Sequence, residues 1–208
     1  MTDPYYADDL VTIYLGDCRE LLPEIEADAV VTDPPYGVGV AEWDESIPFD
    51  VMGTCYQIVS GAILWFGTAS KIAEAYRSFL VAPDRLLIWA PRFQLGGPAQ
   101  GGLSYRYHPI YAWRLSKQPD AKNVWDVFDY AAESPQACFW DHPSTKPVPL
   151  MRTLVGFTSG TVLDPFMGSG TTLVAAKTLG RRSIGIEIEE RHCEAAAKRC
   201  SQEVLGLL

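Results

Sequence analysis

The sequence has little positive charge and few cysteines. Its 208 residues carry 17 Lys and Arg against 26 Asp and Glu, a formal net charge of −9, which is unfavourable for a protein that binds a polyanion over its whole surface. The five cysteines are scattered and form no Cys-x-x-Cys pair. Their number and spacing argue against a disulfide framework and against a tetrahedral zinc site.

The sequence also lacks a long hydrophobic run. Its strongest apolar stretch, Ala62 to Phe66, is too short to span a bilayer. The N-terminal residues MTDPYYADDL are acidic and polar, whereas a signal peptide needs a positive start and an apolar core. We therefore expect a cytoplasmic protein with no membrane association. A hydrophobic fraction of 48% and a charged fraction of 21% exclude intrinsic disorder.

Short β-branched or aromatic runs alternate with helical-period stretches along the chain, which predicts an α/β fold with a mostly parallel sheet. The expected strands are Val11 to Leu15, Ala29 to Thr32, Ala62 to Phe66, Arg85 to Trp89, Tyr107 to Leu115, Thr161 to Leu163 and Ser183 to Glu187. The expected helices are Ser70 to Leu80, Val148 to Phe157, Gly170 to Leu179 and Glu190 to Leu205. Residues 91–106 and 116–147 are irregular, and loops of that length are usually functional.

One glycine loop follows the apolar strand at 161–163. It reads Asp164-Pro165-Phe166-Met167-Gly168-Ser169-Gly170-Thr171-Thr172 and leads into a predicted helix, whose N-terminal N–H groups would face a ligand. Glu187 ends the next strand, at the spacing that places a carboxylate on ribose hydroxyls. A P-loop needs Lys where Thr171 stands, and a dinucleotide fingerprint needs Gly where Leu173 stands. A tight turn with a helix cap would explain Gly168 and Gly170 alone, but Glu187 and the Asp-Pro-Phe favour a nucleoside-containing cofactor.

A second motif, Asp33-Pro34-Pro35-Tyr36, ends the apolar strand at 29–32. The prolines fix the backbone and supply no N–H, so carbonyl and carboxylate oxygens form a rigid rim of acceptors beside an aromatic ring. Such a rim suits an amino group on a nucleobase. The rim oxygens would accept hydrogen bonds from this amino group and so localise its lone pair on nitrogen. Tyr36 would stack on the base. The simpler alternative is a proline turn capped by Asp33.

With both motifs in this order, the sequence resembles the S-adenosylmethionine-dependent DNA amino-methyltransferases that modify N6 of adenine or N4 of cytosine. The catalytic motif precedes the cofactor loop, which matches the family's circularly permuted β order. The resemblance implies a single methyltransferase domain over residues 1–208. Its fold would be Rossmann-like, with a mostly parallel seven-stranded sheet that contains one antiparallel strand. It also implies bacterial, archaeal or phage origin, as in restriction–modification systems, and flipping of the target base out of double-stranded DNA.

Further segments match the family residue by residue. Asp17 and Cys18 follow the first strand, where the family binds the cofactor's adenine. His142 and Lys146 occupy its His-Pro-x-x-Lys-Pro segment, beside the methionine end. Without the family resemblance, His142 would be interpreted as a loop residue that forms hydrogen bonds, and Lys146 as a solvated surface charge. The implied catalytic residues are Asp33, Pro34, Pro35 and Tyr36. The implied cofactor residues are Asp17, Cys18, Asp33, His142, Lys146, Asp164, Pro165, Phe166, Gly168, Ser169, Gly170, Thr171, Thr172 and Glu187.

The expected chemistry uses no metal and no covalent nucleophile, because a sulfonium methyl group is already activated and transfer depends on placement. In this family Asp at position 33 favours adenine N6. Cytosine N4 is the alternative, followed by an RNA or protein-glutamine substrate. A nucleotide- or DNA-binding module that has lost catalysis is a third interpretation.

The charge is unevenly distributed along the chain. Residues 1–70 hold one base and 13 acids, whereas the segment from Arg85 to Lys122 is basic and rich in aromatic residues. Such a segment is typical of a nucleic-acid-binding face. We expect phosphate contacts from Arg92, Arg106, Lys117 and Lys122. The loops 91–106 and 116–141 would replace the family's larger target-recognition region, unless recognition is shared with a second subunit in a homodimer.

Overall fold

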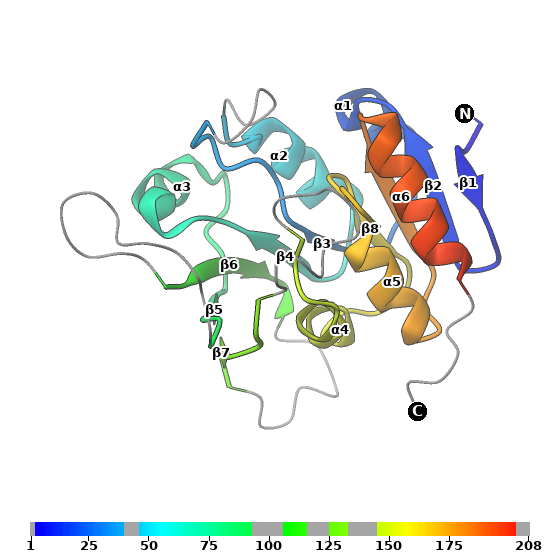
Figure 1. Ribbon diagram of the computed structural model, residues 1–208. Coiled ribbons are helices and arrows are strands. Elements are labelled where there is room, and N and C mark those ends of the chain that lie inside the picture. The colour runs from blue at the N-terminus through cyan, green and yellow to red at the C-terminus, as the bar shows by residue number, and fades with distance from the viewer. Residues whose placement is uncertain (1–2, 40–45, 93–105, 116–124, 133–144, 203–208) are drawn as a thin grey trace.

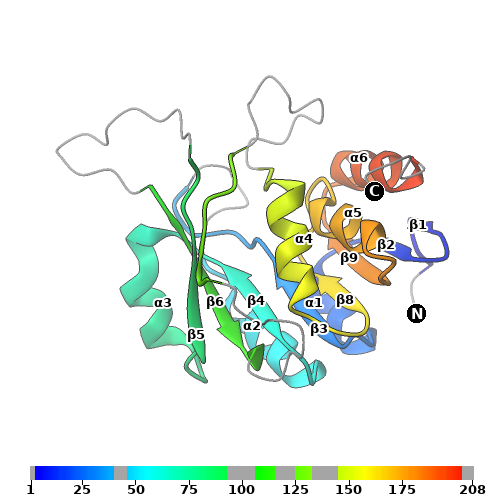
Figure 2. The same cartoon turned by 90° about the horizontal axis from the view of Figure 1, so that it is seen from below.

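The computed structural model describes residues 3–39, 46–92, 106–115, 125–132 and 145–202. These residues form one sheet with helices on both faces (Figures 1 and 2). The strands are β1 (Tyr6–Ala7), β2 (Val11–Leu15), β3 (Ala29–Thr32), β4 (Ile63–Phe66), β5 (Arg85–Trp89), β6 (His108–Trp113), β7 (Val127–Phe128), β8 (Val162–Asp164) and β9 (Ser183–Glu187). The helices are α1 (Cys18–Leu21), α2 (Phe49–Ile58), α3 (Ile72–Ser78), α4 (Val148–Gly156), α5 (Thr171–Thr178) and α6 (Glu190–Ser201), with 3-10 turns η1 (Leu22–Glu24) and η2 (Ala69–Lys71).

The strand order is β1-β2-β9-β8-β3-β4-β6-β5-β7. Strands β2, β9, β8, β3 and β4 pair in parallel, and β6 runs antiparallel to both β4 and β5. The seven predicted strands are confirmed. As predicted, one of these seven strands is antiparallel to the others, and it is β6. The predicted total of seven is too low, because two-residue strands β1 and β7 extend the described sheet and β1 adds a second antiparallel pairing. Strands of two residues carry no periodic signal.

The parallel strands are buried on both faces, which explains their continuous apolar sequences. On one face, Val31 and Leu64 pack with residues of α4 and α5. On the other, their neighbours Val30 and Ile63 pack with residues of α1, α2 and α3. Helix α6 packs with α5 over β2, around Val11. The sheet is therefore the middle layer of three.

The four predicted helices are confirmed, and α1 and α2 are additional. Helix α2 carries the apolar spacing of a helix at Val51, Met52 and Cys55, which are all buried. Gly53 and Thr54 weaken its helix propensity, so the segment was not predicted. The ends of α3 and α6 were predicted too long, because α3 begins after η2 and α6 ends at Ser201.

The last described strand lies beside the second: β9 pairs in parallel with β2, from Val11↔Ser183 to Leu15↔Glu187. This confirms the permuted order, in which the final strand-helix unit leads spatially into the first long strand. In the described part of the chain, no helix is both long and apolar enough to cross a membrane.

Gly170 provides a test of how tightly the glycine loop packs on α6. Gly170 has φ +78°, and an added Cβ would lie 2.7 Å from Ala196 Cβ. Gly180 has a similar φ of +64° but open space around it. We expect Gly180→Ala to cost about 1 kcal/mol of unfolding free energy through backbone strain alone. Gly170→Ala should cost a further 1–3 kcal/mol or so through overpacking. Equal losses of stability in denaturant titrations of the two variants would contradict this packing.

Candidate active site

A cavity of about 390 Å³ opens at the carboxyl ends of β2, β3, β8 and β9. Parallel strands bring their carboxyl ends to one edge of a sheet, so motifs distant in sequence meet there. Except for Gly170, every described residue predicted for catalysis or cofactor binding lines this cavity. These residues are Asp17, Cys18, Asp33, Pro34, Pro35, Tyr36, Lys146, Asp164, Pro165, Phe166, Gly168, Ser169, Thr171, Thr172 and Glu187. His142 lies outside the described residues.

The glycine loop is held from α6. Arg199 Nη1 donates to Ser169 O at 2.7 Å, to Ser169 Oγ at 2.8 Å and to Thr171 Oγ1 at 3.2 Å. Gly170, in the left-handed region, is the N-cap of α5. Arg199 carries no local sequence signal for this role, because Ser169 lies 30 residues earlier in the chain. The loop is therefore preformed by contacts within the protein.

Glu187 joins the end of β9 to this loop. Its Oε2 accepts from Gly168 N at 3.0 Å and its Oε1 from Glu189 N at 2.9 Å. Burial raises the pKa of this carboxyl above its usual value. A carboxylate accepts about four hydrogen bonds, so Glu187 retains acceptor capacity on the cavity wall. Its contact with a ribose diol stays a prediction.

Asp17 follows β2, the strand that pairs with β9, and is the N-cap residue of α1. Its carboxylate caps α1 by accepting from Arg19 N at 2.9 Å, and Arg19 also pairs with Asp50 at 2.7 Å. Cys18 is buried, which raises the pKa of its thiol to about 12. A neutral thiol at this position is not a nucleophile.

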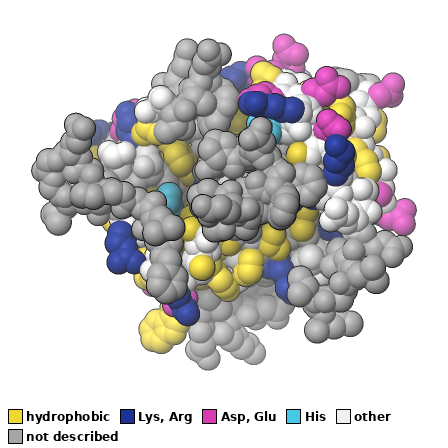
Figure 3. All heavy atoms as spheres, in the orientation of Figure 1, with side chains coloured by type: hydrophobic (Ala, Val, Ile, Leu, Met, Phe, Trp, Pro, Cys, Tyr) yellow, Lys and Arg dark blue, Asp and Glu magenta, His cyan; other side chains and the backbone are white. Residues whose placement is uncertain are grey.

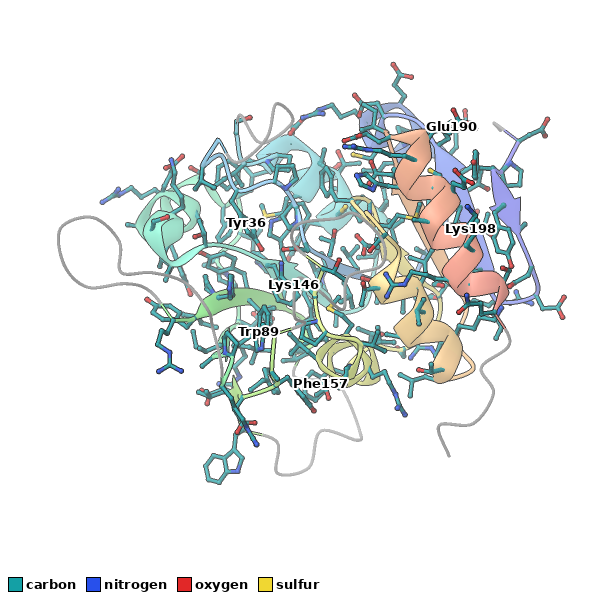
Figure 4. All side chains as sticks on the ribbon, viewed as in Figure 1. Tyr36, Trp89, Lys146, Phe157, Glu190 and Lys198 are labelled. Carbon is teal, nitrogen blue, oxygen red and sulfur yellow. The ribbon has the colours of Figure 1, made fainter. Side chains whose placement is uncertain are left out.

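Asp33 stands directly after β3, and its carboxylate has two protein donors. Lys146 Nζ and the Tyr36 hydroxyl both donate to it. The Lys146 side chain is only 6% exposed, and its ammonium lies 5.8 Å from the Tyr36 ring centroid (Figure 4). The prediction placed Lys146 with the cofactor, whereas its ammonium here contacts the carboxylate of the proposed catalytic motif. A carboxylate accepts about four hydrogen bonds, so Asp33 retains capacity for a further donor.

Asp164 lines the cavity and is buried, at 3% exposure. It accepts from Thr32 Oγ1 at 2.6 Å, from Thr172 Oγ1 at 2.5 Å and from Phe166 N at 3.2 Å. Burial, together with the charge of Asp33, raises the pKa of Asp164 to about 6. The predicted cofactor ligand thus has protein partners on both carboxylate oxygens.

The walls of the cavity suit a flat base and a cationic group. Phe166, which packs edge-on against Trp65, and Ile188, which is 62% exposed, present apolar surface. Ile188, Glu189 and His192 also line the cavity, and they belong to no recognisable sequence motif. The cavity volume lies within the roughly 300–1,000 Å³ of ligand sites. Its acidic lining and Glu187 acceptors fit a nucleoside that carries a sulfonium.

The two described candidates for DNA contacts lie at this same edge of the sheet. Arg92 follows β5, pairs with Asp129 at 2.7 Å and is exposed. Arg106 precedes β6 and donates to Arg92 O at 3.1 Å. Lys117 and Lys122 lie outside the described residues, as do most of the loops 91–106 and 116–141. In Figure 3, acidic side chains gather on the side of α1, α6 and β1, away from β5 and β7.

Among the residues that the structure describes, no three His, Cys, Asp or Glu side chains gather in a way that could hold a metal ion. The four described cysteines are all buried thiols that form no disulfide. The cavity lining combines hydrogen-bond acceptors, a glycine loop and aromatic surface.

Comparisons with known proteins place these features in a family. A family model for DNA methylases, N6_N4_Mtase, matches residues 87–198. Type II methyltransferase M.ScaI of Streptomyces caespitosus is 24% identical, over 98% of this chain and 86% of the relative. DNA adenine methyltransferase YhdJ of Escherichia coli (strain K12) is also 24% identical, over 93% of this chain and 84% of the relative.

Two solved structures show the same fold. The M1.HpyAVI–SAM complex has a TM-score of 0.70 and 23% identity, and the alignment covers 92% of this chain and 100% of that one. PvuII DNA methyltransferase (cytosine-N4-specific) has a TM-score of 0.74 and 16% identity, with 98% and 90% covered. The fold is thus the Rossmann-like fold of DNA methyltransferases. Because the family model matches more than half of its length, the chain belongs to the N6-adenine/N4-cytosine family of S-adenosylmethionine-dependent DNA methyltransferases.

Proposed function

We propose that the protein methylates the exocyclic N6 of adenine in double-stranded DNA, on a base flipped out of the duplex. The observation that carries this proposal is the position of Asp33 and the Pro34-Pro35-Tyr36 rim on the wall of the cavity that also holds the glycine loop and Glu187. Asp at position 33 favours adenine in this family, and one relative is named as an adenine methyltransferase. Cytosine N4 is the second candidate, because one structure of the same fold is titled cytosine-N4-specific.

The cofactor would lie between the ends of β2, β8 and β9. Glu187 would accept from its ribose hydroxyls, the Gly168 loop would meet its polar end, and Asp17 would face its adenine. Cys18, Pro165, Phe166, Ser169, Thr171 and Thr172 would form the surrounding surface, with Lys146 and His142 toward its methionine end. When bound, S-adenosylmethionine supplies a methyl group activated by a sulfonium sulfur.

The chain's own part in the reaction is to prepare the amine. The lone pair of an exocyclic amine is conjugated with the ring, which makes the nitrogen a poor nucleophile. Asp33 and the Pro34 carbonyl would each accept one N–H, which localises the lone pair and offsets positive charge that develops on nitrogen. Tyr36 would stack on the flipped base, a contact worth roughly 1–3 kcal/mol.

Phosphate contacts would come from the same edge of the sheet. Arg92 and Arg106 stand at the ends of β5 and β6 nearest the cavity. Lys117 and Lys122, with the loops 91–106 and 116–141, would add to this surface. These loops are short for a region that recognises a DNA sequence. We therefore also propose that two subunits of a homodimer share this recognition.

The role of Asp33 in methyl transfer can be separated from its contribution to the stability of the folded protein. Asp33→Ala should abolish transfer of labelled methyl groups to duplex DNA while cofactor binding persists. It also removes the carboxylate beside a buried ammonium, at a cost on the order of 3 kcal/mol. Asp33→Ala/Lys146→Met removes both charges, so it should regain stability in thermal unfolding and remain inactive. Full activity in either variant would contradict the proposed mechanism.

The modified base can be identified directly. Duplex DNA methylated by the purified protein should yield N6-methyladenine on enzymatic digestion and nucleoside mass spectrometry, because the site is proposed to hold an adenine amine. Single-stranded DNA and RNA of the same sequence serve as controls. Detection of N4-methylcytosine without N6-methyladenine would reject the adenine assignment and leave the family assignment intact.

Glu187 provides a test of the cofactor position. Glu187→Gln keeps one oxygen acceptor but loses the charge, so affinity for S-adenosylmethionine, measured by calorimetry without DNA, should fall about 10-fold. Glu194→Gln is a matched control, because Glu194 is exposed on α6 and pairs with Lys198 at 2.6 Å, away from the cavity lining. If both variants bind the cofactor as the parent does, Glu187 does not hold the ribose.

A further inference from the structure

The two motifs of the site are carried by neighbouring strands that separate where the motifs begin. Strands β3 and β8 pair only at Ala29↔Val162 and Val30↔Leu163. Beyond this point β3 continues to pair with β4, up to Thr32↔Trp65, and β8 pairs with β9, up to Asp164↔Gly185. The following connections also diverge, since β3 leads through α2 to β4 and β8 leads through α5 to β9. A crevice opens between the strand ends as a result.

A single buried carboxylate spans this crevice where the backbone pairing has ended. Asp164 Oδ1 accepts from Thr32 Oγ1 at 2.6 Å, and Asp164 Oδ2 accepts from Thr172 Oγ1 at 2.5 Å. Thr32 is fully buried and Thr172 is 2% exposed. Asp164 therefore joins the last residue of β3, the start of the glycine loop and the first turn of α5.

We propose that Asp164 is a positioning residue for methyl transfer, which sets the place of Asp33 relative to the cofactor loop through its hydrogen bond to Thr32. The inference rests on the proposed role of Asp33 as the holder of the target amine. Thr32 and Asp33 are consecutive, so a hydroxyl fixed on Asp164 also fixes the backbone that carries the Asp33 carboxylate. In this proposal Asp164 acts through the protein groups that it binds, the hydroxyls of Thr32 and Thr172.

Two physical arguments support this role. Hydrogen bonds to a buried carboxylate are short and roughly twice as strong as neutral ones, so the bridge is stiff. Transfer between two bound reactants is sensitive to placement, and a misplacement of about 1 Å can cost on the order of 100-fold in rate. Burial also raises the pKa of Asp164, so the ionised form is held at a cost in stability. A carboxylate retained at such a cost is expected to serve the site.

The test removes one hydroxyl of the bridge at a time. Thr32→Val is nearly isosteric and breaks only the link to β3. We expect it to lower the single-turnover rate of methyl transfer, at saturating cofactor and DNA, by about 10-fold or more. Its affinity for S-adenosylmethionine, measured without DNA, should stay within about twofold, because the link from Asp164 to Thr172 and α5 is intact. Asp164→Asn, which can bond both threonine hydroxyls through its oxygen and its amide, should keep a higher rate than Thr32→Val.

Thr158→Val is the matched control for loss of a buried hydroxyl. Thr158 is 5% exposed and Oγ1 donates to Val155 O at 2.8 Å, at the end of α4 and outside the cavity lining. This variant should lose thermal stability comparably and transfer methyl groups at the parent rate.

Two results would overturn the inference. One is a parent-like transfer rate in Thr32→Val, and the other is a fall in cofactor affinity as large as the fall in rate. Either result combined with an inactive Asp33→Ala leaves the proposed function standing. An active Asp33→Ala removes the proposed function itself.

Discussion

The whole site depends on the separation of β3 and β8 after two paired residues. Two parallel strands that stay paired leave no space between their carboxyl ends. Here each strand continues to pair with its other neighbour, so the segment Asp33–Tyr36 and the glycine loop face each other across a crevice. The Asp164 carboxylate then replaces the missing backbone hydrogen bonds, because Thr32 and Thr172 hold it from two sides. The cavity is open and its two walls are nonetheless linked.

The contact between Lys146 and Asp33 gives the site its local charge balance. The Asp33 carboxylate and the Lys146 ammonium carry opposite charges and contact each other directly. The same pairing lets the ammonium remain at 6% exposure without an isolated buried charge. The excess of acids in residues 1–70, which at first argued against a nucleic-acid substrate, thus includes Asp17 and Asp33 on the cavity wall. Acidity there suits an amine and a cationic cofactor, while Arg92 and Arg106 lie on the neighbouring surface.

Most of the sheet could be predicted from sequence because each long parallel strand is a continuous apolar run, such as Ile63–Phe66, bounded by turn residues. Helix α2 was missed because Gly53 and Thr54 weaken its helix propensity, and β1 and β7 were missed because two residues form no periodic pattern. The residues of the two motifs were recognisable because each motif is contiguous. Two contacts could not be predicted, because they join segments far apart in the chain and depend on tertiary packing. They are the contacts of Lys146 with Asp33 and of Arg199 with Ser169.

The pairing of β2 with β9 has a consequence for how the protein is made. In the described sheet, β2 has only the two-residue β1 as a partner until Ser183–Glu187 has been synthesised. Gly16 N donates to Glu187 O at 2.9 Å, so the loop that carries Asp17 also gains its support from β9. Contacts between such distant segments form slowly, and domains emerge from the ribosome N-terminus first. We therefore expect the side of the cavity formed by β2 and β9 to assemble last, although the segment that carries Asp33 and Tyr36 is synthesised much earlier.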